Sequence, residues 1–197
     1  MSDRVAVVGA GVVGCAVARA LAPDHDVVVV EKGRVAAEAT ALTAGLVTMT
    51  PSYSDVPPIA ELANGFFREY DGTRHFRYTE RESVEPVPRD REGEARRRVE
   101  RLAGEGVAVS FVEAETMTER YPRIDTSDVV GAVVFEGTGW VDPSTFATAL
   151  GDDAAERGAA FRTDTAVERV LCEEGAVTGV ETESGVVEAD SVVAAAG

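Results

Sequence analysis

Three glycines near the start of the chain have the spacing of a turn that binds a phosphate group. They follow a short apolar run, Val5–Val8, of the kind expected for a parallel strand buried on both faces. The first glycine, Gly9, would allow a tight turn out of this strand. Gly11 would let a phosphate approach the backbone, and Gly14 would let the following helix lie close to the strand. The pattern predicts a nucleotide phosphate at the start of a helix; a glycine-rich turn in another kind of α/β protein is the alternative.

The residues around this turn extend the predicted site. The backbone N–H groups of Val12 and Val13 lie at the expected start of the helix, where the helix dipole favours negative charge. Glu31 ends a second apolar run, at the distance where an acid accepts hydrogen bonds from a ribose hydroxyl, and Lys32 adjoins it. An acid here disfavours NADP, because it would repel the 2′-phosphate. The motif itself leaves FAD and NAD as the candidate dinucleotides.

The composition limits the classes of partner. The chain has 197 residues, 45% of them apolar, which is enough for one sizeable domain or two small ones. Its net charge of −16 disfavours nucleic acid and anionic membranes as partners, since both are polyanions. Lys32 is the only lysine among 19 basic residues, a bias that resembles the proteins of salt-loving archaea. An acidic protein from a GC-rich genome is the alternative.

Neither cysteine has the spacing of a metal site or of a redox pair. We predict that Cys15, in the first helix, and Cys172, in a later strand, are buried free thiols, which suits a reducing cytoplasm. No metal site is predicted. The first residues do not form a basic leader. The apolar stretch Val5–Leu21 contains three motif glycines and Arg19, so we predict no membrane span.

The middle of the chain predicts several helices and strands. Apolar residues recur at helical spacing between Ile59 and Tyr70, and we expect this face, including Leu62, to lie in the core. Short strands are expected at His75–Tyr78 and Ser83–Val87, and an amphipathic helix at Asp90–Gly104. Further on, Asp142 and Pro143 have the types expected for the cap and the first residue of a helix.

A loop of small residues follows the acid, and here the chain resembles a known family. The loop reads Ala39-Thr40-x-x-Thr43-Ala44-Gly45-Leu46. With the glycine turn and Glu31 it resembles the N-terminal signature of the D-amino-acid-oxidase-like FAD oxidoreductases, which include glycine oxidase, sarcosine oxidase, D-amino-acid dehydrogenase and the flavin-type glycerol-3-phosphate dehydrogenase. The resemblance implies FAD as the cofactor, with Ala39 and Thr40 near its phosphates. It implies that four residues lie against the isoalloxazine ring: Thr43, Ala44, Gly45 and Leu46. Threonine replaces the more usual serine at positions 40 and 43.

The second half of the chain resembles the same family in the same order. Residues 139–143, Gly-Trp-Val-Asp-Pro, are similar to the family's lead into a returning helix. By resemblance, the backbone of Val167 holds the adenine edge, and Ala196 and Gly197 approach the cofactor closely. The implied fold is an α/β Rossmann-type FAD-binding domain, like that of glutathione reductase, with an inserted α+β substrate subdomain. Residues 1–50 and 143–197 would form the FAD-binding domain, and residues 51–142 the inserted segment.

The resemblance also implies a reaction. Family members oxidise a small amine or amino acid by hydride transfer from the carbon that bears the amine to the flavin, followed by imine hydrolysis. Family chains are much longer than this one, so we expect a part truncated at its C-terminus. One alternative is a dinucleotide-binding module without activity of its own, which needs a second chain to supply the C-terminal half. Another is an NAD-dependent dehydrogenase, against which the loop Ala39–Leu46 argues. No catalytic residue is predicted.

Overall fold

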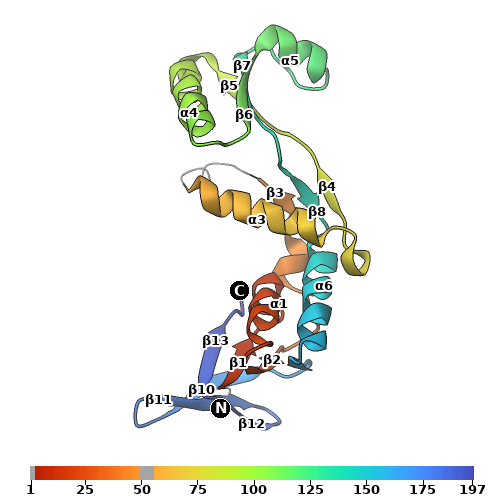
Figure 1. Ribbon diagram of the computed structural model, residues 1–197, viewed down its shortest axis with the longest axis vertical. Helices are drawn as coiled ribbons and strands as arrows, with labels where there is room; N and C mark the ends of the chain where they lie inside the picture. The colour runs from red at the N-terminus through yellow and green to blue at the C-terminus, as the bar shows by residue number, and fades with distance from the viewer. Residues whose placement is uncertain (1–2, 49–55) are drawn as a thin grey trace. The chain divides into compact units, whose positions relative to one another are not determined.

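The computed structural model describes residues 3–48 and 56–197, and the chain divides into two compact units (Figure 1). Unit 1 takes in Met1–Gly45, Gly72–Arg77 and Asp142–Gly197. Unit 2 takes in Leu46–Asp71 and Tyr78–Val141. The chain therefore leaves unit 1 and returns to it twice, because the short segment Gly72–Arg77 belongs to unit 1.

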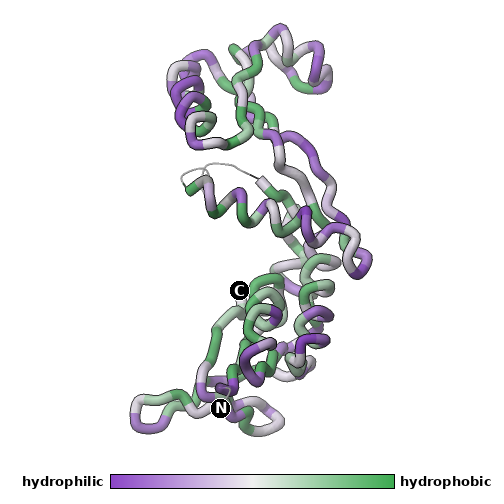
Figure 2. The backbone as a smooth tube through the Cα atoms, viewed as in Figure 1, coloured by the Kyte–Doolittle hydropathy of each residue, from purple (hydrophilic) through white to green (hydrophobic). Residues whose placement is uncertain are grey.

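Unit 1 is built on a four-stranded parallel sheet with the order β13-β1-β2-β9. Its strands are β1 (Arg4–Val8), β2 (Asp26–Val30), β9 (Ala160–Arg162) and β13 (Ser191–Ala194). The inner strands β1 and β2 are buried on both faces, as their continuous apolar runs predict. Figure 2 shows the hydrophobic colour along these strands. The predicted α/β fold is confirmed.

Helices and an antiparallel sheet complete unit 1. The helices α1 (Val12–Leu21) and α6 (Pro143–Glu156) pack together, and an Arg19–Asp153 ion pair of 2.5 Å joins them. The antiparallel sheet has the order β10-β11-β12, with the strands Val167–Glu173, Ala176–Thr182 and Gly185–Glu188. Val180 and Val187 of this sheet form one buried cluster with residues of β1 and β2. One face of the parallel sheet thus packs against the antiparallel sheet.

The predicted start of α6 is confirmed. The Asp142 side chain caps the helix by accepting a hydrogen bond from the Thr145 N–H at 2.6 Å, and Pro143 is the first helical residue. Gly158, with φ = +109°, follows the end of the helix. A left-handed residue at this place is common where a helix ends.

Among its described residues, unit 2 contains two small antiparallel sheets and the helices α3 (Pro57–Tyr70), α4 and α5. One sheet has the order β3-β8-β4, with the strands Leu46–Val47, Gly139–Val141 and Tyr78–Glu80. The other has the order β5-β7-β6, with the strands Ser83–Pro88, Val129–Phe135 and Val109–Glu113. Helices α4 (Glu92–Gly104) and α5 (Ala114–Arg120) contribute Leu102 and Met117 to separate clusters on the second sheet. The amphipathic helix predicted at Asp90–Gly104 is therefore confirmed, preceded by the 3₁₀ turn η3 (Arg89–Arg91).

The predicted core face of helix α3 (Pro57–Tyr70) is wrong in part. Tyr70 is buried, but the side chains of Ile59 and Leu62 are 57% and 77% exposed. From this face Phe67 stacks its ring on that of Tyr78 in β4, and from another face Asn64 and Arg68 donate hydrogen bonds to the connection after β7. Helical spacing identifies an apolar face, but it does not identify what covers that face.

Two further expectations are corrected. The strand predicted at His75–Tyr78 begins only at Tyr78, because Thr73–His75 forms the 3₁₀ turn η2. Arg74 and His75 have φ values of +49° and +68°, which a strand does not allow. Cys172 is exposed rather than buried, and no residue of β10 is fully buried. Within the described residues, no helix is both long and apolar enough to cross a membrane.

Candidate cofactor site

The carboxyl end of β1 is the point where the order of the parallel sheet reverses. β2, the next strand in sequence, lies on one side of β1, and β13, the last strand, lies on the other. In open α/β sheets, ligands bind in the crevice outside the strand ends at such a point. The glycine turn, defined here as Gly9–Gly14, leaves β1 at this end. The end of the chain returns beside it, because the Ala195 N–H donates to the Val8 carbonyl oxygen at 2.8 Å.

Two glycines of this turn have backbone atoms directly against them. Gly9 has φ = +104°, and a Cβ there would lie 2.4 Å from the carbonyl oxygen of Ala195. A Cβ on Gly14 would lie 1.9 Å from the carbonyl oxygen of Gly9. Both distances are far below van der Waals contact. The strand, the helix and the returning chain therefore approach this closely only where no side chain intervenes.

The N-terminus of α1 presents backbone donors without an acidic neighbour on the helix. The first intrahelical hydrogen bond runs from the Cys15 N–H to the Gly11 carbonyl oxygen at 2.9 Å. The N–H groups of Val12, Val13 and Gly14 precede that bond, so they have no partner within the helix. The first turn contains no acidic side chain. This end of the helix therefore favours an anion.

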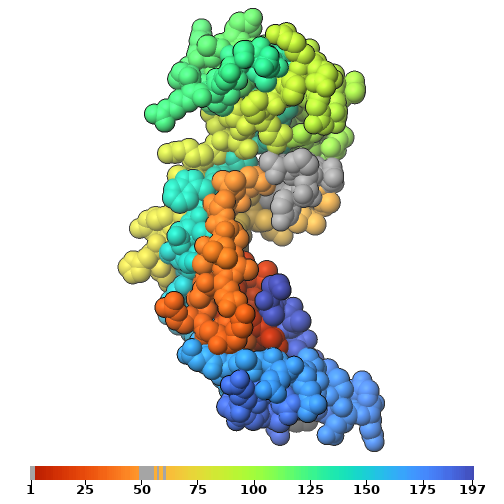
Figure 3. Space-filling view, turned by 180° about the vertical axis from the view of Figure 1, so that it is seen from behind, coloured from red at the N-terminus to blue at the C-terminus, as the bar shows by residue number. Residues whose placement is uncertain are grey.

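The small-residue loop lies against this helix end. Its 3₁₀ turn η1 (Ala39–Leu42) buries Thr40, whose Oγ1 accepts the Val12 N–H at 3.0 Å. A Cβ on Gly11 would lie 3.0 Å from the same oxygen. A Cβ on Gly197 would lie 3.8 Å from the Cβ of Ala39. Figure 3 shows this loop, in orange, beside the red of the first residues and the dark blue of the last ones.

Glu31 lies at the other side of the glycine turn. Its carboxylate accepts the Ala10 N–H at Oε2 and the Gly33 N–H at Oε1, both at 2.8 Å, and the residue is 9% exposed. The Glu31 carbonyl oxygen accepts the Thr165 N–H at 2.9 Å. This bond holds the segment that leads into β10 beside Glu31. The first residue of β10, Val167, packs its side chain on the cluster shared with β1 and β2.

Other predicted residues lie farther along these segments. Lys32 is exposed and forms an ion pair with Glu38 at 2.7 Å, and this hydrogen bond raises the pKa of the lysine. The Thr43 hydroxyl donates to the Thr40 carbonyl oxygen at 3.3 Å. Ala44 and Ala196 are exposed, and Gly45 has φ = +66°. Leu46 opens β3 and belongs to unit 2.

Sequence reasoning missed two residues, Ala36 and Ser144, whose hydrogen bonds hold the glycine turn in place. Ala36 is buried with φ = +61°, and its N–H donates to the Ala10 carbonyl oxygen at 3.0 Å. The Ser144 hydroxyl, at the start of α6, donates to the Ala36 carbonyl oxygen at 3.3 Å. Alanine and serine carry no chemistry that would have marked them. Only the fold shows that they meet.

The arrangement fits the pyrophosphate of a dinucleotide. It combines a helix N-terminus whose Val13 N–H has no partner within the helix, a turn without side chains at Gly9 and Gly11, and the hydroxyl of Thr40, which accepts the Val12 N–H. Glu31 lies where a ribose acid is expected. Among the described residues, no group of three or more potential ligands gathers to hold a metal ion.

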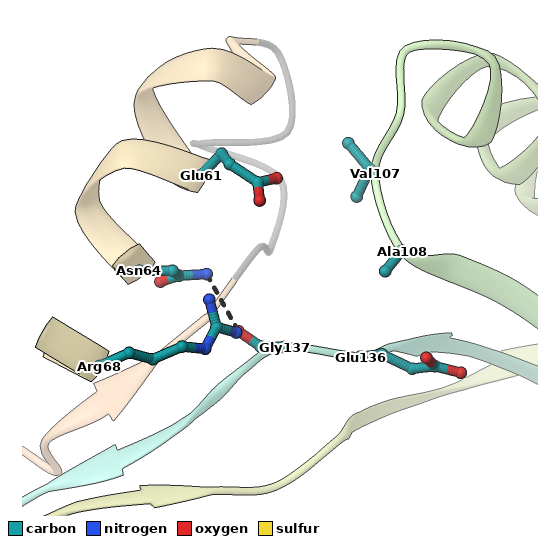
Figure 4. A pocket seen from close by; sticks show the side chains of 7 residues that line it. All are labelled: Glu61, Asn64, Arg68, Val107, Ala108, Glu136 and Gly137. Carbon is teal, nitrogen blue, oxygen red and sulfur yellow. Dashed lines mark hydrogen bonds between the residues drawn. The ribbon is translucent and has the colours of Figure 1, made fainter. Parts of the chain in front are cut away.

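Unit 2 holds a cavity of about 80 Å³ that contains none of the predicted site residues (Figure 4). Helix α3 contributes Glu61, Asn64 and Arg68 to its wall. The Asn64 Nδ2 and a guanidinium nitrogen of Arg68 both donate to the Gly137 carbonyl oxygen, at 3.3 and 2.7 Å. These bonds tie α3 to the connection between β7 and β8. Three residues that line the cavity, Asn64, Arg68 and Gly137, are thus the ones that bond α3 to this connection.

Comparisons with known proteins agree with this fit. The model of the DAO family, described as FAD dependent oxidoreductase, matches residues 4–197. Glycine oxidase from Bacillus cereus is 28% identical with a TM-score of 0.80, over 100% of this chain and 55% of that one. The mitochondrial pyruvate dehydrogenase phosphatase regulatory subunit of Mus musculus is 28% identical over 98% of this chain and 23% of that protein. D-amino acid dehydrogenase from Cereibacter sphaeroides is 36% identical over 52% of this chain and 24% of that protein.

The chain thus spans about half the length of the solved glycine oxidase and about a quarter of the length of these curated relatives. The family model nevertheless covers both units, from the first residue of β1 to the end of the chain. The glycine turn, the acid after β2 and the returning strand β13 all lie inside the matched range. This protein therefore belongs to the DAO family of FAD-dependent oxidoreductases, whose members are FAD-binding flavoproteins.

Proposed function

We propose that unit 1 binds FAD at the glycine turn and that the protein takes part in the oxidation of a small amine or amino acid. The observation that carries this proposal is the N-terminus of α1. It offers backbone donors to an anion beside Gly11, which has no side chain, at the switch point of a parallel sheet. The names of the relatives, glycine oxidase and D-amino acid dehydrogenase, support the substrate class.

Each part of the cofactor has proposed partners. The pyrophosphate would accept a hydrogen bond from the Val13 N–H and share the Val12 N–H with Thr40 Oγ1. Thr40 accepts the Val12 N–H with its oxygen, so its own O–H can donate to a phosphate oxygen. Each carboxylate oxygen of Glu31 holds one backbone donor and keeps a lone pair for a ribose hydroxyl. The backbone of Val167, led there by the bond between Thr165 and Glu31, would face the adenine.

The remaining predicted residues complete this proposal. Lys32 would lie near the ribose, Ala39 and the pair Ala196–Gly197 near the phosphates, and the segment Thr43–Leu46 along the flavin ring. FAD, when bound, accepts a hydride from the carbon that bears the amine. The chain's part is to bind and orient the cofactor and to keep water from its phosphates. The free thiols Cys15 and Cys172 fit a reducing compartment, and we place the protein in the cytoplasm.

A second candidate is a binding module that needs a partner chain. The similarity to a regulatory subunit of Mus musculus over 98% of this chain favours it, because that protein's name describes regulation rather than catalysis. In this case unit 1 would bind FAD or only its ADP half. A second chain would then supply a part corresponding to the rest of glycine oxidase.

Flavin binding tests both candidates. The protein should be purified in concentrated salt, its visible spectrum recorded, and FAD titrated against the colourless fraction. We expect saturable binding of one FAD per chain. Gly11→Val should abolish it, because the side chain would occupy the approach of the phosphates. Gly104→Val is the matched control, since a Cβ at Gly104 meets nothing within 4 Å.

The two outcomes lead to different conclusions. Bleaching of the bound flavin by a small amine or amino acid under anaerobic conditions would establish the oxidoreductase. Binding without bleaching by any such substrate would favour the module. Equal FAD binding by wild type and Gly11→Val would refute the placement of the phosphates at the glycine turn.

A further inference from the structure

The peptide unit around Ala10, in the middle of the glycine turn, is held on both sides. Its N–H donates to Oε2 of Glu31 at 2.8 Å. Its carbonyl oxygen accepts the Ala36 N–H at 3.0 Å and the Cys15 thiol at 3.5 Å. Ala10 itself is fully buried. The turn is therefore fixed by contacts within the protein itself.

Glu31 is the charged member of these contacts, and it joins two turns. One carboxylate oxygen holds Ala10 of the glycine turn, and the other holds the N–H of Gly33, directly after β2. Hydrogen bonds to an ionised acceptor are about twice as strong as neutral ones. The carboxylate is nearly buried, so water competes poorly for these two donors. Losing either bond would leave a backbone N–H without its acceptor.

The strained backbone of Ala36, which contacts Ala10, shows that several contacts together hold this region in one conformation. A non-glycine residue with φ = +61° is strained, and it persists only where its surroundings hold it. Here the Ala10 carbonyl oxygen holds its N–H, and the Ser144 hydroxyl holds its carbonyl oxygen. The strained loop and the glycine turn therefore fix each other.

We propose that Glu31 is a positioning residue for the phosphates as well as a ribose ligand. This inference rests on the proposed function, because it concerns the same cofactor site. By clamping Ala10 and Gly33, the carboxylate keeps the turn in the one conformation whose N–H groups can receive a phosphate. If that conformation makes up only a fraction of the population, the apparent affinity for phosphate falls to that same fraction of its full value.

Glu31→Gln breaks the clamp, because glutamine offers one acceptor oxygen where the two N–H groups need two. The probes are inorganic pyrophosphate and adenosine, each titrated separately while the backbone amides of α1 are followed by NMR. If Glu31 positions the turn, the variant binds both probes about tenfold more weakly, since a lost hydrogen bond to a charged group is of that order.

The direction in which Glu31→Gln changes the affinity for pyrophosphate distinguishes a positioning role of Glu31 from a role in ribose binding alone. If Glu31 serves only the ribose, the variant should lose adenosine affinity while pyrophosphate binds equally or more tightly, because a repelling negative charge has gone. That result would overturn the proposal. Asp153→Asn is the matched control, because it also converts a partly buried carboxylate of unit 1 to an amide, away from the turn. It should leave the affinity for pyrophosphate unchanged.

A measurement on the ligand-free wild type keeps the proposal testable if the variant does not fold. Hydrogen exchange of the Ala10 and Gly33 amides should be strongly protected, in contrast to that of Val13. Exchange of Ala10 at the rate of an open amide would refute the clamp. Failure of both probes to bind the wild type would instead refute the proposed function, and the exchange of Ala10 would still decide the clamp.

Discussion

Gly14→Ala is the sharpest test of how the glycine turn is packed. A Cβ at this position would lie 1.9 Å from the Gly9 carbonyl oxygen and 3.0 Å from its carbonyl carbon. Carbon–oxygen contacts are normally about 3.3 Å, so α1 would have to move away by roughly 1.4 Å. The opposing atom is backbone and cannot rotate aside. The cost should therefore reach the upper part of the range for overpacked sites, about 3 kcal/mol.

The gain in helix propensity offsets part of this cost. Replacing glycine by alanine inside a helix is worth about 1 kcal/mol, which leaves a net destabilisation of about 2 kcal/mol. For a chain of this size the melting temperature should fall by about 4–8 °C. Gly104→Ala, at the open end of α4, receives the propensity gain without a clash and should be neutral or stabilising. Thermal unfolding followed by circular dichroism measures both variants. A Gly14→Ala protein as stable as Gly104→Ala would refute the packing argument.

Three further predictions follow from single residues and from the net charge. Iodoacetamide at pH 8 should modify the exposed Cys172 and spare Cys15, because burial, aided by the charges of Glu31 and Asp152, raises the pKa of Cys15 to about 12; peptide mass spectrometry would show it. Asp142→Ala should cost about 1 kcal/mol of unfolding free energy at neutral pH, because alanine has no side-chain acceptor for the Thr145 N–H. This N–H holds the pKa of Asp142 below its usual value, so the difference, followed by urea unfolding, should shrink as the pH falls through that lowered pKa. The net charge of −16 should make the melting temperature rise with KCl, because salt screens the self-repulsion; a flat or falling curve would contradict this.

The parts of the fold that could be predicted are those where one local pattern decides the outcome. The continuous apolar runs of β1 and β2 allow only strands buried on both faces, and these strands lie at the centre of the sheet. The pair Asp142–Pro143 combines a side-chain acceptor with a fixed φ, and α6 starts there. Both signals lie within a few residues of the structure that they specify.

The parts that could not be predicted depend on what packs against a residue. Leu62 has the spacing of a core residue, yet it is exposed, while Phe67 on the same face of α3 stacks on Tyr78. Cys172 is apolar enough for a core, yet no residue of β10 is fully buried. Arg74 and His75 adopt left-handed conformations while the adjacent Phe76 is fully buried against Phe146, with 4.7 Å between ring centroids. No local conformational preference of arginine or histidine predicts such a turn.

The candidate site depends both on a local sequence pattern and on packing between distant residues. The glycine spacing shows where a phosphate would bind, but the geometry of the turn is set by residues distant in sequence. Glu31 holds Ala10 from across 21 positions, Thr40 reaches Val12 across 28, and Ala195 closes on Gly9 from the far end of the chain. Each of these contacts exists only when the parallel sheet of unit 1 is assembled. The binding site is therefore a property of the folded unit, and a substitution at any of these distant residues should act on the phosphates through the turn.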